Sequence, residues 1–152
     1  MMNNTNNKAE RAVELFSGGF NCSQAVLTAY ASEFGLSEEL TLKLGSELGS
    51  GARNGELCGA VSGALLVLGL KYGHCNSADT ERKMRAYAIA DEFTRRFRKV
   101  NGSIVCRDLL GYDLTKPEDM AVISEKKLFC EFCPLMVKSA VEVLEGILSE
   151  YK

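Results

Sequence analysis

The chain has 152 residues, the size of one ordinary domain and long enough to bury a hydrophobic core. Hydrophobic residues make up 46% and charged residues 25%, which is the globular average and excludes the disordered and fibrous classes. The net charge of -2, with no basic stripe along the chain, argues against nucleic acid or an anionic membrane as a partner.

The N-terminal stretch MMNNTNNKAE is polar and has no apolar run after a charged segment, so it does not resemble a secretory signal. The most apolar stretch, residues 60–70, is too short to cross a bilayer. We therefore expect a cytoplasmic protein. Residues 1–7 are expected to form a disordered lead-in, and residues 8–152 a single helical domain.

Helical periodicity runs along the chain, and no segment keeps the two-residue alternation of a strand. Asn21 and Ser37 are expected to cap helices, and Pro117 and Pro134 stand where helices begin. The almost wholly apolar run 58–72 is expected to be the central buried helix. The expected helices span, in chain order, 8–16, 22–34, 37–48, 58–72, 79–99, 106–110, 117–128 and 133 to the C-terminus. These features predict an all-α, single-domain bundle of roughly six to eight helices.

The longest expected helix, 79–99, has one charged and one apolar face. Its apolar face is expected to carry Met84, Ala88, Phe93 and Phe97, which recur at helical spacing. Burial of an apolar stripe against neighbouring helices is what stabilises such a helix. We therefore expect this face to pack into the core of the bundle.

The chain has six cysteines, and four of them fall near expected helix starts. Cys22 follows the Asn21 cap, Cys58 opens the buried helix, Cys106 stands at another helix start, and Cys133 precedes a proline. A helix N-terminus offers unpaired N–H groups and the positive end of the helix dipole, both of which favour thiolate over thiol. These positions predict lowered pKa values for Cys22, Cys58, Cys106 and Cys133, which are the candidate catalytic residues.

Neighbouring residues support this prediction, but a plainer interpretation also exists. Ser103 is placed to cap the helix that begins at Cys106, while Arg53 and Arg107 would add positive charge near the cysteines. Alternatively, a free cysteine is often an inert, small, buried hydrophobe. Cys75 follows a helix end, where the dipole has the opposite sign, and is expected to be incidental.

Other motifs give weaker indications of chemistry. Cys130 and Cys133 form a C-x-x-C at a helix start, but the βαβ context of thioredoxin-like proteins is missing, and a zinc site with four cysteine ligands needs a second such pair. Gly59, in a glycine-rich region, and Arg53 are the candidate cofactor contacts, although close helix packing explains Gly59 more simply. His74, the only histidine, lies in an expected turn, which does not favour a hydrolase.

Four spaced motifs together resemble the C-GCAxxG-C-C family of redox-active proteins. They are Phe20–Val26, the C-G-A-x-x-G stretch from Cys58, Cys106–Gly111, and Cys133-Pro134, and they extend over most of the chain. The resemblance implies that Cys22, Cys58, Cys106 and Cys133 are the family's four cysteines, and that Cys75 and Cys130 are additional. It also implies a redox role, without a substrate, electron partner or established cofactor.

Three hypotheses for function follow. In the first, Cys58 is the nucleophile of a thiol–disulfide oxidoreductase and Cys22, Cys106 or Cys133 resolves it. In the second, the same four thiolates are metal ligands for zinc, copper(I) or an iron–sulfur cluster. In the third, the thiols only fill the core. The sequence does not identify a redox partner, and its apolar helices are compatible with a homodimer.

Overall fold

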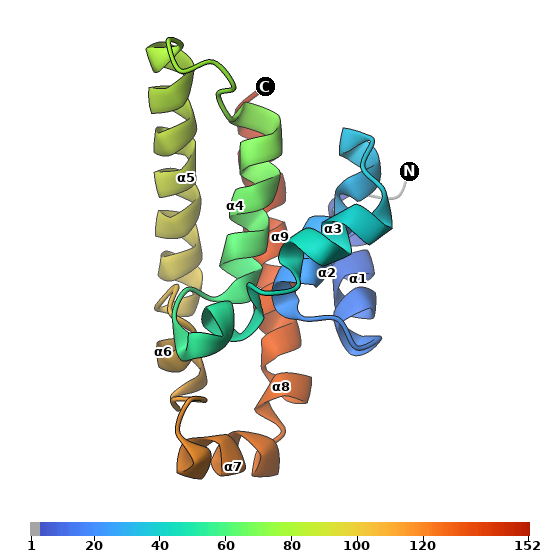
Figure 1. Cartoon of the computed structure of the whole chain (residues 1–152), viewed down its shortest axis with the longest axis vertical. Coiled ribbons are helices and arrows are strands. Elements are labelled where there is room, and N and C mark those ends of the chain that lie inside the picture. The colour runs from blue at the N-terminus through green and yellow to red at the C-terminus, as the bar shows by residue number, and fades with distance from the viewer. Residues whose placement is uncertain (1–3) are drawn as a thin grey trace.

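The structure, a computed structural model, describes residues 4–152, with side chains from residue 7 onward, and it is built from helices (Figure 1). Within that part of the chain there is no strand, only an isolated antiparallel bridge between Leu57 and Val105. The expected all-α class is therefore confirmed. The elements are α1 (Asn4–Ser17), α2 (Cys22–Ala29), η1 (Ala31–Phe34), α3 (Glu38–Gly45), η2 (Gly51–Gly55), α4 (Gly59–Tyr72), α5 (Thr80–Asn101), α6 (Cys106–Leu110), α7 (Pro117–Glu125), α8 (Leu128–Glu131) and α9 (Cys133–Glu150).

Helix α4 lies at the centre of the bundle, because it packs against α2, α5 and α9. Helix α1 packs on α2 and α9 on the other side of the molecule (Figure 1). Ala60, Val61, Ala64 and Val67 of α4 have no exposed surface, which confirms the expected buried central helix. No helix of residues 4–152 is long and apolar enough to cross a membrane.

Two glycines allow α2 to pass unusually close to its neighbours. A Cβ atom at Gly63 of α4 would lie 2.8 Å from the Ser23 carbonyl oxygen of α2. A Cβ atom at Gly45 of α3 would lie 2.9 Å from the Gln24 Cα atom. Since real Cβ atoms do not approach so closely, only glycine fits at either position. Helix α2, and Cys22 at its start, are thereby fixed between α3 and α4.

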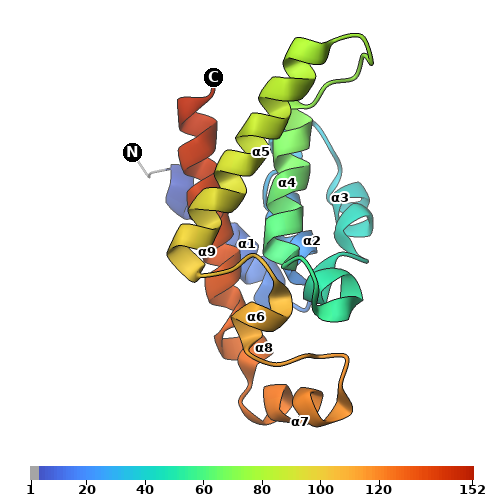
Figure 2. The ribbon, with the colours of Figure 1, turned by 90° about the vertical axis from the view of Figure 1, so that its left-hand side faces the viewer.

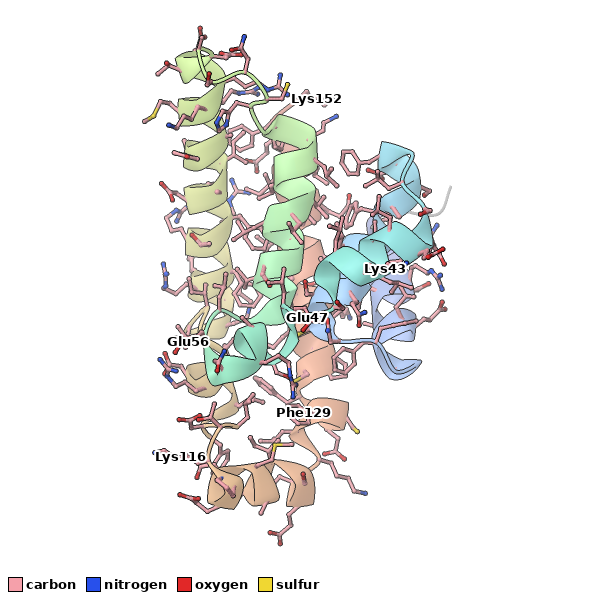
Figure 3. All side chains as sticks on the ribbon, viewed as in Figure 1. Lys43, Glu47, Glu56, Lys116, Phe129 and Lys152 are labelled. Carbon is pink, nitrogen blue, oxygen red and sulfur yellow. The ribbon has the colours of Figure 1, made fainter. Side chains whose placement is uncertain are left out.

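A second, smaller core lies at one end of the bundle, in a region formed by α6, α7 and α8 that we call the end lobe (Figure 2). Its buried residues are Cys106, Leu110 and Ile123, and Phe129 and Cys133 pack partly buried against them. Cys58 belongs to the main core instead. Figure 3 shows Phe129 near the junction of the end lobe with the bundle. The cysteines of the expected site thus come from both sides of this junction.

The element boundaries differ from the expected ones mainly at four places, and one of these is α3, which ends at Gly45 instead of continuing to residue 48. Helix α1 begins at Asn4, so residues 4–7, expected in the disordered lead-in, are helical, while residues 1–3 lie outside the described part. The helix expected over 22–34 is α2 followed by the tighter turn η1, and Gly35 ends it as expected. The helix expected over 117–128 divides into α7 and α8, because Lys127 adopts φ 54°, which no right-handed helix accommodates.

Candidate functional site

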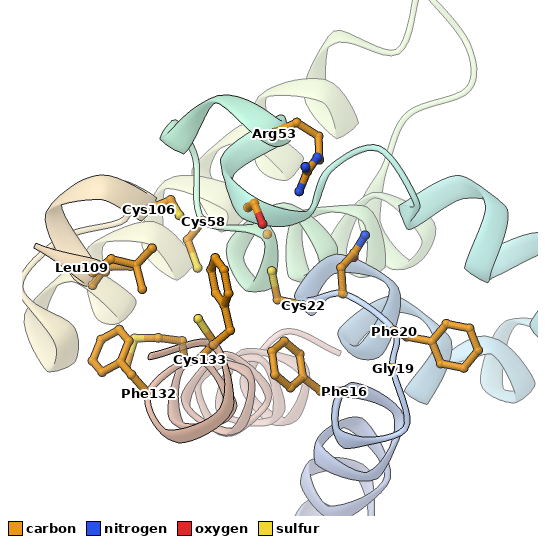
Figure 4. A pocket seen from close by; sticks show the side chains of 16 residues that line it. Phe16, Gly19, Phe20, Cys22, Arg53, Cys58, Cys106, Leu109, Phe132 and Cys133 are labelled. Carbon is orange, nitrogen blue, oxygen red and sulfur yellow. The ribbon is translucent and has the colours of Figure 1, made fainter. Parts of the chain in front are cut away.

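A pocket of about 280 Å³ lies where the starts of α2, α4, α6 and α9 meet (Figure 4). The four cysteines that line it are Cys22, Cys58, Cys106 and Cys133. The remaining lining is mostly apolar and includes four phenylalanines: Phe16, Phe20, Phe129 and Phe132. Cys75 and Cys130 are exposed and do not line this pocket. The structure therefore brings together the four cysteines that the sequence singled out.

Each of these cysteines stands at the start of a helix, as expected. Cys22 is the first residue of α2, Cys106 of α6 and Cys133 of α9, while Cys58 is the N-cap of α4. Asn21 caps α2: its side chain accepts a hydrogen bond from the Gln24 N–H at 2.9 Å, and the Asn21 N–H donates to the Gln24 side chain at 2.9 Å. This reciprocal cap fixes where α2, and therefore Cys22, begins.

The starts of α4 and α6 are joined by backbone hydrogen bonds around the Leu57–Val105 bridge. The Cys58 N–H donates to the Ile104 carbonyl at 2.8 Å, and the Cys106 N–H donates to the Glu56 carbonyl at 2.6 Å. In such an antiparallel pair, both cysteine side chains leave the bridge on the same face. Two helices distant in the sequence thus present their cysteines to one pocket.

Arg107 is engaged outside the pocket. Its guanidinium forms two hydrogen bonds with the Glu56 carboxylate, at 2.8 and 3.1 Å. Its charge still lowers the pKa of Cys106, as expected, but the effect of burial is larger. Ser103 does not cap α6 as expected: the N-cap is Val105, and the Ser103 hydroxyl accepts a hydrogen bond from the Val105 N–H at 3.0 Å. Ser103 instead stabilises the turn that leads into the bridge.

Gly59, at the start of α4, contacts the Cys22 sulfur. A Cβ atom at Gly59 would lie 2.3 Å from Cys22 Sγ and 3.0 Å from the Gly49 Cα atom. The sulfur of Cys22 therefore occupies the space that any larger residue at position 59 would need. Gly59 was expected to be a cofactor contact, and what the structure shows is its contact with this thiol.

The loop between α3 and α4 contains one turn of left-handed backbone. Ser50, Gly51, Ala52 and Arg53 have φ values of 56°, 63°, 54° and 65°. For residues other than glycine this conformation costs about 1–2 kcal/mol each. Ser50 and Arg53 line the pocket, and Figure 4 shows the Arg53 guanidinium directed toward it. The sequence predicted only a glycine-rich loop here, because of these four residues Gly51 alone favours left-handed backbone.

Comparison with protein families gives one match. The family model described as "Putative redox-active protein (C_GCAxxG_C_C)" matches residues 20–147. The chain belongs to this family. The family's name contains the motif G-C-A-x-x-G. The corresponding stretch of this chain, Cys58–Gly63, reads C-G-A-V-S-G, so the first two residues of the motif are exchanged. Comparison with curated proteins and with solved structures gave no match.

In this member of the C_GCAxxG_C_C family the pocket thiols have raised pKa values, so the expected lowering is wrong. Burial raises the pKa of Cys106 to about 11 and that of Cys58 to about 12, and it also raises the pKa of Cys22 and Cys133. A thiolate at Cys22 adds a like charge for each of the other three. Backbone N–H groups at the helix starts act in the opposite direction at Cys22 and Cys58, but desolvation outweighs them.

The four sulfurs do not form a ready metal site as they are placed. Among the residues that the structure describes, no three histidine, cysteine, aspartate or glutamate side chains are arranged to hold one metal ion. Metal binding by these four cysteines would require the sulfurs to shift and the thiols to lose their protons. Metal binding therefore remains a prediction from the sequence.

The raised pKa values predict that the reduced protein loses stability in alkali. Cys58 ionises at its ordinary value of 9.0 in the unfolded chain but at about 12 in the folded one. The folded state therefore holds more protons across this range, so the free energy of unfolding falls as the pH rises above 9. Cys58 alone would contribute a loss of up to roughly 4 kcal/mol.

Urea unfolding of the reduced protein at a series of pH values between 7 and 11 measures this loss. Cys58→Ala serves as the comparison, because it removes the titrating group. A stability that stays level up to pH 11 in the unsubstituted protein would contradict the prediction.

Proposed function

We propose that this protein carries out thiol–disulfide chemistry in the four-cysteine pocket, with Cys22 and Cys58 as the working pair. The observation that carries the proposal is the position of the Cys22 sulfur, which rests on Gly59, the residue next to Cys58. An ionised Cys22 also raises the pKa of Cys58, which agrees with their proximity. The family's description as redox-active agrees with this assignment.

The apolar environment favours the uncharged forms of both redox states. The raised pKa values keep the reduced thiols protonated at neutral pH, and the oxidised pair is an uncharged disulfide. In the overall reaction, two cysteine thiols reduce an external disulfide, giving one protein disulfide and two small thiols, which take up the two protons. Neither the initial nor the final state leaves a charge buried in the pocket.

Cys106 and Cys133 are placed to exchange with this pair. Both line the same pocket. Burial has the largest effect on the pKa of each, and an ionised Cys22 has the next largest. Ionised Cys22 raises the pKa of each of the other three pocket thiols, while Cys58 and Cys106 also act on Cys133. We propose Cys22 as the central partner and Cys58 as the nucleophile that the sequence favoured.

The test is to oxidise the reduced protein with glutathione disulfide, alkylate the remaining thiols and map the linked peptides by mass spectrometry. We expect a reversible Cys22–Cys58 crosslink that is lost in Cys22→Ser and unchanged in Cys75→Ser, since Cys75 is exposed outside the pocket. A protein whose six thiols all remain free after oxidation would contradict thiol–disulfide function. A crosslink that joins only other cysteines would contradict the choice of pair.

The second candidate is a soft-metal or iron–sulfur protein with the same four cysteines as ligands. It is favoured by their convergence on one pocket from four helix starts. Anaerobic purification followed by zinc, copper and iron analysis distinguishes the two. Metal in stoichiometric amount that is lost in Cys22→Ser and kept in Cys75→Ser supports the second candidate. Metal-free protein with a reversible disulfide supports the first.

A further inference from the structure

Two of the four pocket thiols, Cys58 among them, are buried, while Cys22 and Cys133 are only partly exposed, which restricts how a bulky external disulfide can reach the pair. Cys58 is 7% exposed and Cys106 is 8% exposed. Attack on a disulfide requires the thiolate sulfur to approach the disulfide along the S–S bond, so a bulky partner needs an accessible thiol. Cys130 offers one: it is exposed at the surface of α8, three residues before the pocket cysteine Cys133.

The backbone between these two cysteines follows a helical path, although α8 and α9 are separate elements. Phe132 joins them with φ -101° and ψ -50°, in the right-handed region. Its N–H donates to the Leu128 carbonyl at 2.9 Å, and the Leu135 N–H donates to the Phe132 carbonyl at 3.0 Å. Residues three apart on such a path are neighbours with Cβ atoms roughly 5–6 Å apart, close to the distance that a disulfide joins.

Helical geometry also explains why one cysteine faces outward and the other inward. Phe129, on the inner side of α8, lines the pocket. At about 100° per residue, Cys133 lies roughly 40° from Phe129 and roughly 60° from Cys130 around the helix axis. Cys133 is thus placed between the pocket face and the solvent face. Cys130 is also among the groups whose charge acts on Cys133, which agrees with their proximity.

We propose that Cys130 is the entry point for external disulfides, passing oxidation through Cys133 to the buried Cys22–Cys58 pair; this inference rests on the proposed function. The Cys130 thiolate attacks the external disulfide, forms a mixed disulfide and releases one thiol. Cys133 then attacks the Cys130 sulfur, which forms a Cys130–Cys133 disulfide and expels the second thiol. The two cysteine protons pass through solvent to the two released thiolates.

The remaining steps are exchanges within the protein and need no further oxidant. Cys22 attacks the Cys133 sulfur, giving a Cys22–Cys133 disulfide and returning Cys130 to its thiol. Cys58 then attacks the Cys22 sulfur, giving the Cys22–Cys58 disulfide and restoring the Cys133 thiol. The net change is one external disulfide reduced and one buried pair oxidised. The C-x-x-C formed by Cys130 and Cys133 was only weak evidence for thioredoxin-like chemistry without a βαβ context. In this scheme it acts as the pair that receives oxidation from outside.

The experiment compares a bulky and a small oxidant on the full-length reduced protein. Glutathione disulfide is the bulky oxidant; hydrogen peroxide is the small one, which enters the pocket directly and is reduced to water. We expect Cys130→Ser to slow formation of the Cys22–Cys58 disulfide by glutathione disulfide about tenfold or more, and to leave the peroxide rate almost unchanged. Cys75→Ser, which removes the other exposed cysteine, is the matched control and should alter neither rate.

A second variant locates the first chemical step. In Cys133→Ser the mixed disulfide on Cys130 has no resolving partner, so glutathione should accumulate there, detected by acid quenching and mass spectrometry. Cys130→Ser that is oxidised by glutathione disulfide at the unsubstituted rate would overturn the entry role. If the unsubstituted protein forms no Cys22–Cys58 disulfide with either oxidant, the proposed function itself is overturned, and the two failures are thereby distinguished.

Discussion

At pH 7 Cys58 and Cys106 are expected to react with iodoacetamide at least a hundredfold more slowly than the same cysteines in the unfolded chain, and Cys22 and Cys133 are expected to be slowed as well. Thiolate is the reactive species, and raising the pKa of Cys106 from 9.0 to about 11 lowers its thiolate fraction about a hundredfold. For Cys58, with a pKa of about 12, the reduction is about a thousandfold. Limited access to the pocket slows the reaction further.

The measurement is a time course of alkylation, followed peptide by peptide, at pH values from 6 to 11. The protein in urea gives the reference rates, and the exposed Cys75 gives an internal one. The Cys106 rate should rise about tenfold per pH unit until it levels near pH 11. A rate that levels near pH 7 would show that the helix dipole prevails over burial, as the sequence alone suggested.

Gly59→Ala is expected to destabilise the protein by about 1–3 kcal/mol, the usual cost of forcing an extra carbon into a packed site. The new Cβ atom would lie 2.3 Å from Cys22 Sγ, 3.0 Å from the Gly49 Cα atom and 3.2 Å from the Leu48 carbonyl oxygen. Two of these neighbours are backbone atoms that cannot move independently. The sulfur must therefore rotate away, which would also impair the Cys22–Cys58 disulfide.

Gly69→Ala is the matched control, because Gly69 lies in the same helix and a Cβ atom there meets nothing within 4 Å. Alanine is a better helix former than glycine, so this variant should be more stable by about 0.5–1 kcal/mol. Urea unfolding of both variants under reducing conditions measures the difference. Equal stabilities for the two would show that the contact between Gly59 and Cys22 is not a tight one.

The all-α class and the helix starts could be predicted because they depend on local features. Asn21 precedes an apolar run and is followed by Gln24, which together predict the reciprocal cap that the structure contains. The buried helix α4 could be recognised because it is apolar on every side. The placement of four cysteines at helix starts followed from these boundaries, together with the family resemblance.

The buried face of α5 was predicted only in part. Phe93 and Phe97 have no exposed surface, but Met84 is 59% exposed and Ala88 is also exposed. The buried stripe runs through Ile89 instead, one helical turn before Phe93. Met84 and Ala88 lie on a different side of the helix from Phe93 and Phe97, because the number of residues between successive members of the expected face changes between Ala88 and Phe93. Apolar residues alone did not determine which stripe meets the bundle.

The electrostatics of the site could not be predicted from sequence position. Proximity to a helix start is a local property, whereas desolvation depends on every element that closes the pocket. Phe129 and Phe132 of the end lobe, far from Cys22 in the sequence, form part of that enclosure. Likewise, Ala52 and Arg53 do not prefer left-handed backbone, so the strained turn is imposed by tertiary contacts.

The junction between the two cores has a consequence for how the protein is made. Cys22 enters the pocket from α2 and Cys133 from α9, which is synthesised long after α2. Contacts between such distant residues form late, after local helices. The thiols of the nascent chain therefore stay open to oxidants and metal ions until α9 docks, and the docking of α9 is what first encloses them.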